Sequence, residues 1–331
     1  MSQPRPLLER DLAAATATRA NAVGLGCALP EQIVANEQIA ANIGVGEGWI
    51  ERRTGIRARR HAPAHTTLLE LATRASRAAL HDAGIDADPL DLVIVATVSQ
   101  ERRVPNVAPQ LAAALGAGRA GAFDLGAACA GFVTGLAVAG AMIEAGQALT
   151  VLVVGADTLS RHTDPLDRRT AALFGDGAGA VVLAAGDAGG ISLVELATDG
   201  GASELIVTDP ATDLISMDGQ ETFRLAVATL ERDVRKLCAR AELDPVSDVD
   251  LYVFHQANGR ITRSVCERLD LPAERVVDSI AEVGNTSAAS IPLALEHARR
   301  DGRLRTGSRL LLASVGAGFA SAAALLEWGR A

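Results

Sequence analysis

Short runs of valine, isoleucine and leucine alternate along the chain with longer stretches in which alanine and leucine recur at helical spacing. The apolar runs have the length and composition of buried strands and occupy residues 92–98, 149–154, 180–184, 191–196, 251–254 and 310–314. The helical patterns occupy residues 68–83, 107–115, 131–144, 222–241 and 291–300. This alternation predicts an α/β protein whose helices cover a largely parallel or mixed sheet.

The pattern repeats within the chain. Residues 83–95 resemble residues 241–253, because each segment has a helix end, an acidic turn with proline, and an apolar run that begins after Asp91 or Asp250. Residues 146–156 resemble residues 307–317 at nearly the same offset. Two pairs of similar segments at nearly one offset predict duplicated halves. We expect an N-terminal extension (1–21), a first half (22–187) and a second half (188–331), which meet at a glycine-rich interruption near 184–190.

Composition and charge exclude several classes of protein. Of the 331 residues, 49% are hydrophobic and 21% are charged, which is typical of a globular chain. No apolar run is long enough to span a membrane, and the first 21 residues carry charges without the apolar core of a secretory signal, so we expect a cytoplasmic protein. The net charge of −9 argues against binding to nucleic acid.

Cys129 is the cysteine whose setting favours chemistry. A short strand that includes Phe123 runs into small residues and then into the predicted helix 131–144, which places the thiol at a helix N-terminus. The helix dipole there is expected to lower the pKa of the thiol and to expose a nucleophile. The alternative is a small buried apolar residue. The remaining cysteines, like Cys129, lack the spacing of metal ligands, so no metal site is expected.

Two further polar residues lie where ligand-contacting groups are common. His255 ends the apolar run 251–254, and strand ends are where α/β proteins often place such groups. Its imidazole could accept a proton or donate a hydrogen bond to a carbonyl, or it could be a satisfied structural histidine. Asn285 lies in a loop of small residues, where it could donate to an oxyanion or serve as a turn residue.

Taken together, these segments resemble β-ketoacyl-acyl-carrier-protein synthase III, the chain-initiating condensing enzyme of the thiolase superfamily. The resemblance runs from about Ala22 to Trp328. It is carried by five ordered motifs, which are WIERRTGIR (49–57), DLGAACAGF (124–132), FGDGAGA (174–180), FHQAN (254–258) and GNTSAASIP (284–292). The family implies a thiolase fold, in which two pseudo-symmetric halves form an αβαβα layered architecture, assembled as a homodimer.

The resemblance implies a two-stage reaction that needs no cofactor, with acyl-coenzyme A as a substrate. Cys129 would accept the acyl group, and the backbone amides of Cys129, Ala317 and Gly318 would form the oxyanion hole. Malonyl-acyl-carrier protein would then enter. His255 and Asn285 would hydrogen-bond its thioester carbonyl, and loss of carbon dioxide would give the carbanion that attacks the acyl group.

The resemblance also implies binding residues. Trp49 and Arg53, with Arg168 as a third, would hold the adenine of coenzyme A, although core or interface packing is an alternative for Trp49. A local basic patch would dock the acidic carrier protein and would comprise Arg224, Arg260 and Arg268. Val104 would reach into the acyl pocket of the partner subunit.

One departure from the family leaves an alternative open. The C-terminal segment 316–322 lacks the usual Thr-Trp-Gly, and Val315 replaces an aromatic residue that is credited with assisting decarboxylation. The chain could therefore be an acyltransferase that loads Cys129 and passes the acyl group to a hydroxyl, an amine or a carrier thiol. A non-enzymatic scaffold of the same fold is a third alternative, which the intact Cys129, His255 and Asn285 disfavour.

Overall fold

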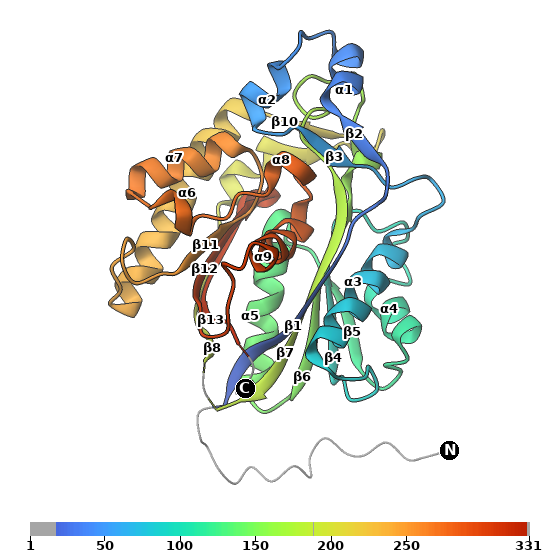
Figure 1. Ribbon diagram of the computed structural model, residues 1–331. Coiled ribbons are helices and arrows are strands. Elements are labelled where there is room, and N and C mark those ends of the chain that lie inside the picture. Colours follow the sequence, from blue (N-terminus) through green and yellow to red (C-terminus); the bar gives the residue numbers. More distant parts are fainter. Residues whose placement is uncertain (1–17, 188, 330–331) are drawn as a thin grey trace.

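Two β-sheets lie on either side of a pair of central helices in the computed structural model, which describes residues 18–187 and 189–329 (Figure 1). The first sheet has the strand order β1-β7-β6-β4-β5, with β1 (Arg19–Ala28), β4 (Leu92–Ala96), β5 (Gly121–Leu125), β6 (Thr150–Thr158) and β7 (Asp176–Gly186). The second has the order β11-β12-β13-β8, with β8 (Gly190–Thr198), β11 (Leu251–Phe254), β12 (Arg309–Gly316) and β13 (Ala320–Glu327). Both sheets are mixed, as predicted.

Helices form three layers around these sheets. The central layer holds α5 (Gly131–Glu144) and α9 (Ser290–Arg300), whose apolar side chains pack between the sheets (Figure 1). The outer face of the first sheet is covered by α3 (Leu68–Ala83) and α4 (Val107–Leu115). The outer face of the second is covered by α6 (Gly219–Ala241) and α7 (Gly259–Leu269). The predicted α/β class and its αβαβα layering are therefore confirmed.

The two sheets repeat one topology, as the internal repeat predicted. Each begins with an antiparallel pair, β1 with β7 and β8 with β13, and continues through another antiparallel pair to a parallel one. Asp91 and Asp250, which match in the repeat, make equivalent hydrogen bonds. The Asp91 carboxylate accepts a hydrogen bond from the amide of Leu149 at 2.7 Å, and the Asp250 carboxylate accepts one from the amide of Arg309 at 2.7 Å.

The boundaries of the halves stay a proposal. All strands of the first sheet lie before residue 187 and all those of the second lie after residue 189, which supports a junction near 187/188. Strand β1 begins at Arg19, and Ala20 and Asn21 are buried. The start of the first half therefore falls ahead of the expected Ala22. Residues 1–17 of the expected extension lie outside the described part of the chain.

Smaller elements gather at one end of the layers, where α1 (Asn36–Ile43), α2 (Trp49–Thr54) and α8 (Ile280–Val283) lie (Figure 1). Four short strands accompany them: β2 (Ile33–Ala35), β3 (Ala58–Arg60), β9 (Ile206–Thr208) and β10 (Ile215–Met217). Across residues 18–187 and 189–329, no helix is both long and apolar enough to cross a membrane. The same residues contain no cluster of His, Cys, Asp or Glu suited to a metal ion.

Candidate active site

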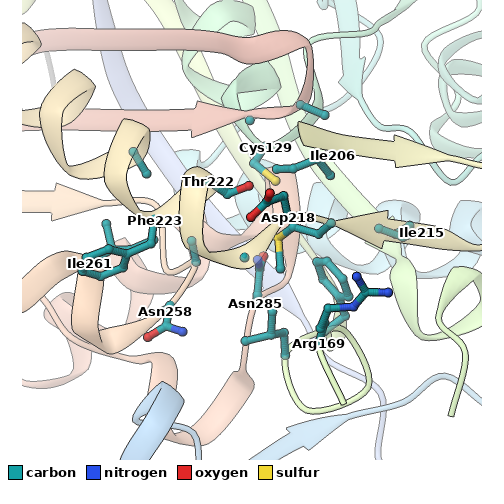
Figure 2. Close-up of a pocket in the computed structure, with 18 of the residues that line it drawn as sticks. Cys129, Arg169, Ile206, Ile215, Asp218, Thr222, Phe223, Asn258, Ile261 and Asn285 are labelled. Atoms are coloured by element: carbon teal, nitrogen blue, oxygen red, sulfur yellow. The ribbon is translucent and has the colours of Figure 1, made fainter. Parts of the chain in front are cut away.

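A single cavity of about 990 Å³ brings together Cys129, His255 and Asn285. Cys129 comes from the start of the central helix of the first half, whereas His255 and Asn285 come from the second half. Figure 2 shows Cys129 and Asn285 reaching the cavity from different elements. Apolar side chains dominate the remaining wall around the thiol, including Leu159, Leu173, Phe174, Ile206, Ile215 and Met217.

Cys129 lies in a tight turn that we call the first elbow, residues 125–131. A short 3-10 turn over Ala128–Ala130 leads directly into α5, and Ala128 enters it with a positive φ of 46°. The carbonyl of Cys129 accepts a hydrogen bond from the Ser314 hydroxyl at 2.6 Å. Gly316 packs so closely that a Cβ there would lie 2.7 Å from the Cys129 amide nitrogen. Strand β12 therefore fixes the position of the Cys129 turn.

The expected lowering of the Cys129 pKa is wrong for the substrate-free protein. Burial raises the pKa of this thiol to about 12, and the nearby Asp157 carboxylate opposes ionisation further. The neighbouring Ser287 hydroxyl and the Cys129 backbone lower the pKa of the thiol but do not offset the burial. In this largely apolar cavity, loss of hydration destabilises the thiolate more than the helix N-terminus stabilises it. Burial of Cys129 therefore favours the protonated thiol.

His255 is a neutral imidazole held in one orientation. Its Nδ1 lies 2.6 Å from the Ser290 hydroxyl, whose oxygen also accepts a hydrogen bond from the Gln256 amide. Because that oxygen already accepts from Gln256, its own proton is available for Nδ1, and this favours the tautomer with a proton on Nε2. Burial lowers the His255 pKa to about 3. The side chain can therefore donate a hydrogen bond without carrying charge.

Asn285 is oriented by the turn that follows it. Its Oδ1 accepts a hydrogen bond from the Ser287 amide at 2.9 Å, and since an amide N–H needs an oxygen acceptor, the side-chain NH₂ is left to donate elsewhere. The backbone of Asn285 pairs with that of Phe174, so the loop is tied to the segment before β7. His255 and Asn285 thus offer two uncharged donors to one cavity.

Of the predicted oxyanion-hole residues, Ala317 and Cys129 line the cavity but Gly318 does not. Ala317 lines the cavity and follows Gly316, which touches the Cys129 amide. Gly318 does not line the cavity, and its φ of 113° is a conformation that favours glycine. Their roles stay predictions.

The three residues expected to hold coenzyme A all line the cavity. The Arg53 guanidinium lies 5.1 Å from the centre of the Trp49 ring. Arg168 donates from Nε to the carbonyl of Ile43 at 2.7 Å and from a terminal nitrogen to the carbonyl of Gly44 at 3.1 Å, so it is tied to the end of α1. An indole face and two guanidinium groups therefore lie along one wall of the cavity.

The residues expected to dock a carrier protein do not form one free patch. Arg224 pairs with Glu221, and Arg268 pairs with Glu231 at 3.2 Å. Arg260 lines the cavity, lies 5.3 Å from the centre of the Phe223 ring, and has no ion pair among the described residues. Arg260 is therefore the member of the three whose charge is available at the cavity.

Val104 lies outside the cavity of its own chain. It is 84% exposed in the loop before α4. The predicted role in the acyl pocket of a partner subunit stays a prediction.

Sequence analysis missed two residues near the thiol. Ser287 lines the cavity, and Asp157 is fully buried beneath it. The signal for Ser287 was its place two positions after Asn285 in GNTSAAS. The signal for Asp157 was a carboxylate soon after the apolar run 149–154, where an unpaired charge would be costly.

A layered αβαβα fold of two similar halves, with a cysteine at the end of one central helix and a histidine and an asparagine facing it, defines a condensing enzyme of thiolase fold. Comparison with known proteins supports this class. The family model described as "3-Oxoacyl-[acyl-carrier-protein (ACP)] synthase III" matches residues 123–200, and the model of its C-terminal part matches residues 238–328.

Individual relatives are similar over nearly the whole chain. A "Beta-ketoacyl-[acyl-carrier-protein] synthase III 2" of Streptomyces coelicolor is 47% identical, with 97% of this chain and 98% of the relative covered. The crystal structure of the Pseudomonas aeruginosa synthase III is 45% identical and covers 95% of this chain and 99% of its own, with a TM-score of 0.89. A priming β-ketosynthase from the R1128 polyketide pathway is 36% identical and covers 97% and 100%, with a TM-score of 0.91. The chain belongs to the 3-oxoacyl-[acyl-carrier-protein] synthase III family.

Proposed function

We propose that this enzyme transfers an acyl group from coenzyme A to Cys129 and condenses it with malonyl-acyl-carrier protein, with loss of carbon dioxide. The product is a β-ketoacyl thioester on the carrier protein. The observation that carries this proposal is the convergence of one thiol and two neutral hydrogen-bond donors, Cys129, His255 and Asn285, on one cavity. The names of the relatives, which include a priming β-ketosynthase of a polyketide pathway, support both fatty-acid initiation and polyketide priming as settings.

In the first stage the sulfur of Cys129 attacks the thioester carbonyl of acyl-coenzyme A. A carbon–sulfur bond forms, the carbonyl electron pair moves to oxygen, and its return expels the thiolate of coenzyme A. The backbone amides of Cys129, Ala317 and Gly318 are the proposed donors to the oxyanion. The close fit of Gly316 against the Cys129 amide supports this assignment, because it holds two of these amides near one point.

In the second stage the malonyl group loses carbon dioxide, and its thioester carbonyl becomes an enolate. His255 Nε2 and the Asn285 NH₂ are the proposed donors to that oxygen. Both groups are uncharged, so their hydrogen bonds strengthen as negative charge develops in the transition state. The carbanion then attacks the acyl carbonyl on Cys129, and the sulfur leaves as the new carbon–carbon bond forms.

Substrate-binding roles follow from the cavity wall. The paired Trp49 and Arg53 offer an aromatic face and a guanidinium for a purine, and Arg168 offers a second cation for coenzyme A. Arg260 is the proposed contact for the acidic carrier protein at the cavity, with Arg224 and Arg268 farther out. The acyl chain would occupy the apolar wall formed by residues such as Ile206 and Met217.

A homodimer is the proposed assembly. Strand β5 is the last strand of its sheet, and Phe123 on it is 40% exposed. An edge strand that carries exposed apolar side chains is suited to pairing with a second copy. Val104 protrudes from the neighbouring loop and would enter the partner's site. Phe123→Glu should yield a monomer in light scattering, whereas a variant that remains dimeric would place the interface elsewhere.

Transfer without decarboxylation, the alternative raised by Val315, gains no support from the site. Val315 lines the cavity and packs with the apolar side chains of the second half, while both proposed enolate donors remain in place. Nothing in the cavity wall singles out a hydroxyl or amine acceptor.

The covalent step is tested by intact-protein mass spectrometry after brief exposure to acyl-coenzyme A. The wild-type chain should gain the mass of one acyl group, and Cys129→Ala should gain none. Cys266→Ala is the matched control, because it removes another partly exposed thiol and should acylate normally. Undiminished acylation of Cys129→Ala would overturn the assignment of the nucleophile.

A further inference from the structure

Asn285 is held in place by the segment that precedes β7, residues 168–175. The Asn285 amide donates to the Leu173 carbonyl at 2.9 Å, and the Asn285 carbonyl accepts a hydrogen bond from the Gly175 amide at 2.9 Å. Leu173 and Phe174 line the cavity together with Asn285. A group that fixes this segment therefore also fixes the proposed donor to the enolate.

A buried arginine outside the cavity holds this segment. Arg59 of β3 is fully buried and does not line the cavity. One terminal nitrogen of its guanidinium donates to the Ala172 carbonyl at 2.8 Å. The other donates to Oδ1 of Asn36 at 2.9 Å and to the Val34 carbonyl at 3.3 Å. The guanidinium therefore ties the 168–175 segment to β2 and to the start of α1.

The stem of Arg59 lies against the backbone on both sides of the pairing through Asn285. A Cβ added to Gly284, which precedes Asn285, would lie 3.1 Å from the Arg59 Cβ. A Cβ added to Gly175 would lie at the same distance from that atom. Arg59 thus lies beside the Asn285 loop and beside its partner segment at once.

A guanidinium is a costly group in this place. Its three acceptors are neutral oxygens, and its Nε makes no hydrogen bond among the described residues. Burial of a charge on neutral partners is unfavourable, and an apolar side chain would fill the space without that penalty. What arginine adds is its planar fork, which directs one nitrogen toward Ala172 and the other toward β2 and α1.

We propose that Arg59 is a positioning residue for Asn285. By holding the Ala172 carbonyl, it fixes the backbone of Leu173, and Leu173 in turn fixes Asn285 with its NH₂ toward the malonyl thioester carbonyl. This inference rests on the proposed role of Asn285 as a donor to the enolate oxygen. A misplacement of about 1 Å can slow a reaction by about 10²-fold, so a loosened segment would be costly for decarboxylation.

The experiment measures release of carbon dioxide from malonyl-acyl-carrier protein by enzyme already alkylated at Cys129, which isolates the second stage. Arg59→Lys keeps the positive charge and most of the stem but lacks the planar fork. It should slow decarboxylation by about tenfold or more. Acylation of the unalkylated variant by acyl-coenzyme A should be nearly unchanged, because Asn285 has no proposed part in that stage.

A double-mutant cycle separates positioning from a general loss of structure. If Arg59 acts through Asn285, Arg59→Lys should have little further effect in an Asn285→Ala background, because the donor that it positions is already absent. Arg299→Lys is the matched control. Arg299 also donates to a backbone carbonyl, that of Leu25 at 3.1 Å, but both residues lie outside the cavity, so decarboxylation should be unaffected.

A second variant and a second measurement cover the case in which Arg59→Lys does not fold. Asn36→Ala removes one acceptor of the guanidinium and should slow decarboxylation by a smaller factor, again only when Asn285 is present. Hydrogen exchange reports on the pairing without any substrate. The amides of Asn285 and Gly175 should exchange faster in Arg59→Lys or Asn36→Ala than in the wild-type chain or in Arg299→Lys.

Three outcomes would overturn the role of Arg59. They are a wild-type rate of decarboxylation in Arg59→Lys, an equal slowing by Arg59→Lys whether or not Asn285 is present, and unchanged exchange of the Asn285 amide. A wild-type chain that releases no carbon dioxide would refute the proposed function instead. The exchange measurement would then still show whether Arg59 holds the Asn285 loop.

Discussion

The two halves of the molecule build the same turn twice and use it differently. The first elbow carries Cys129, and we call residues 284–290 the second elbow. Each has a non-glycine residue of positive φ, Ala128 or Ser287, followed by a short 3-10 turn into a central helix. Each is met by a glycine from the opposite half, since Gly316 packs against Cys129 and Gly155 packs against Ala288. The fold therefore supplies two sites of similar backbone geometry.

Side chains decide which of the two becomes the reactive one. At the second elbow, the Asp157 carboxylate accepts a hydrogen bond from the Ala288 amide. The position that matches Asp157 in the repeat is Gly318, which has no side chain, so that position offers no carboxylate to the first elbow. The comparison teaches that the protein's own carboxylate occupies the Ala288 amide at the second elbow, whereas the Cys129 amide at the first elbow is the one proposed as a donor to an oxyanion.

The largest expected effect comes from adding a methyl group to the glycine that packs against each elbow. In Gly316→Ala, the new Cβ would lie 2.7 Å from the Cys129 amide nitrogen, so acylation should fall by about 10²-fold or more. In Gly155→Ala, the Cβ would lie 2.2 Å from the Ala288 carbonyl oxygen. Decarboxylation and stability should then suffer first, with an overpacking cost of about 1–3 kcal/mol. Mass spectrometry measures the loss of acylation expected in Gly316→Ala, and thermal unfolding measures the loss of stability expected in Gly155→Ala. Equal losses of both half-reactions in both variants would contradict the division of labour.

Removal of a donor from the second elbow should be nearly as severe but confined to one step. Asn285→Ala is expected to slow decarboxylation of malonyl-acyl-carrier protein by about 10²–10³-fold, because one donor to the enolate oxygen is lost. Transfer from acyl-coenzyme A to Cys129 should persist. Release of carbon dioxide by enzyme already alkylated at Cys129 isolates the step, and a variant that decarboxylates normally would remove Asn285 from the mechanism.

A substitution of Trp49, which lies outside both elbows, should alter only the binding of acyl-coenzyme A. Trp49→Ala should raise the KM for acyl-coenzyme A roughly tenfold, since stacking a base on an aromatic ring contributes about 1–3 kcal/mol. The kcat and the KM for the carrier protein should not move. Steady-state kinetics with each substrate varied provides the check, and Trp328→Phe, at the far end of the chain, serves as a control aromatic change. A fall in kcat without a change in KM would argue for a packing role of Trp49 instead.

The smallest expected effect is that of pH on the rate of decarboxylation. Because burial lowers the His255 pKa to about 3, its ring stays neutral at every pH above that value, and decarboxylation should vary little between about pH 5 and 9. Protonation would add charge only in stronger acid. A decarboxylation rate that changes with an apparent pKa near 6 or 7 would show that the imidazole titrates in its ordinary range.

The strongly patterned elements were predictable from the chain alone. The ranges 68–83, 107–115 and 131–144 coincide with α3, α4 and α5. Two core strands, β1 and β13, were missed, because they are built largely from alanine, glycine and serine rather than from valine and isoleucine. These small residues are required by packing. A Cβ on Gly24 or Gly26 of β1 would lie within 2.4 Å of the backbone of α3.

The candidate site was predictable in its reactive groups but not in their electrostatics. Local context made Cys129, His255 and Asn285 candidates, the family resemblance assigned their roles, and one cavity is lined by all three. The pKa of the thiol could not be predicted, because desolvation depends on how the two halves close around it. The place of Asp157 beside the second elbow could not be predicted for the same reason. Its carboxylate accepts the Ala288 amide only when a strand of the first half lies against the second elbow.

The central claim is condensation at Cys129, and the most direct measurement is product analysis after sequential addition of substrates. Purified enzyme is first loaded from a panel of acyl-coenzyme A donors and then given malonyl-acyl-carrier protein validated with another synthase. The account predicts that acyl-Cys129 disappears as carbon dioxide is released, and that the carrier gains the mass of a β-ketoacyl group. An acyl-Cys129 that persists, or that passes its acyl group to the carrier unchanged and without carbon dioxide, would contradict it.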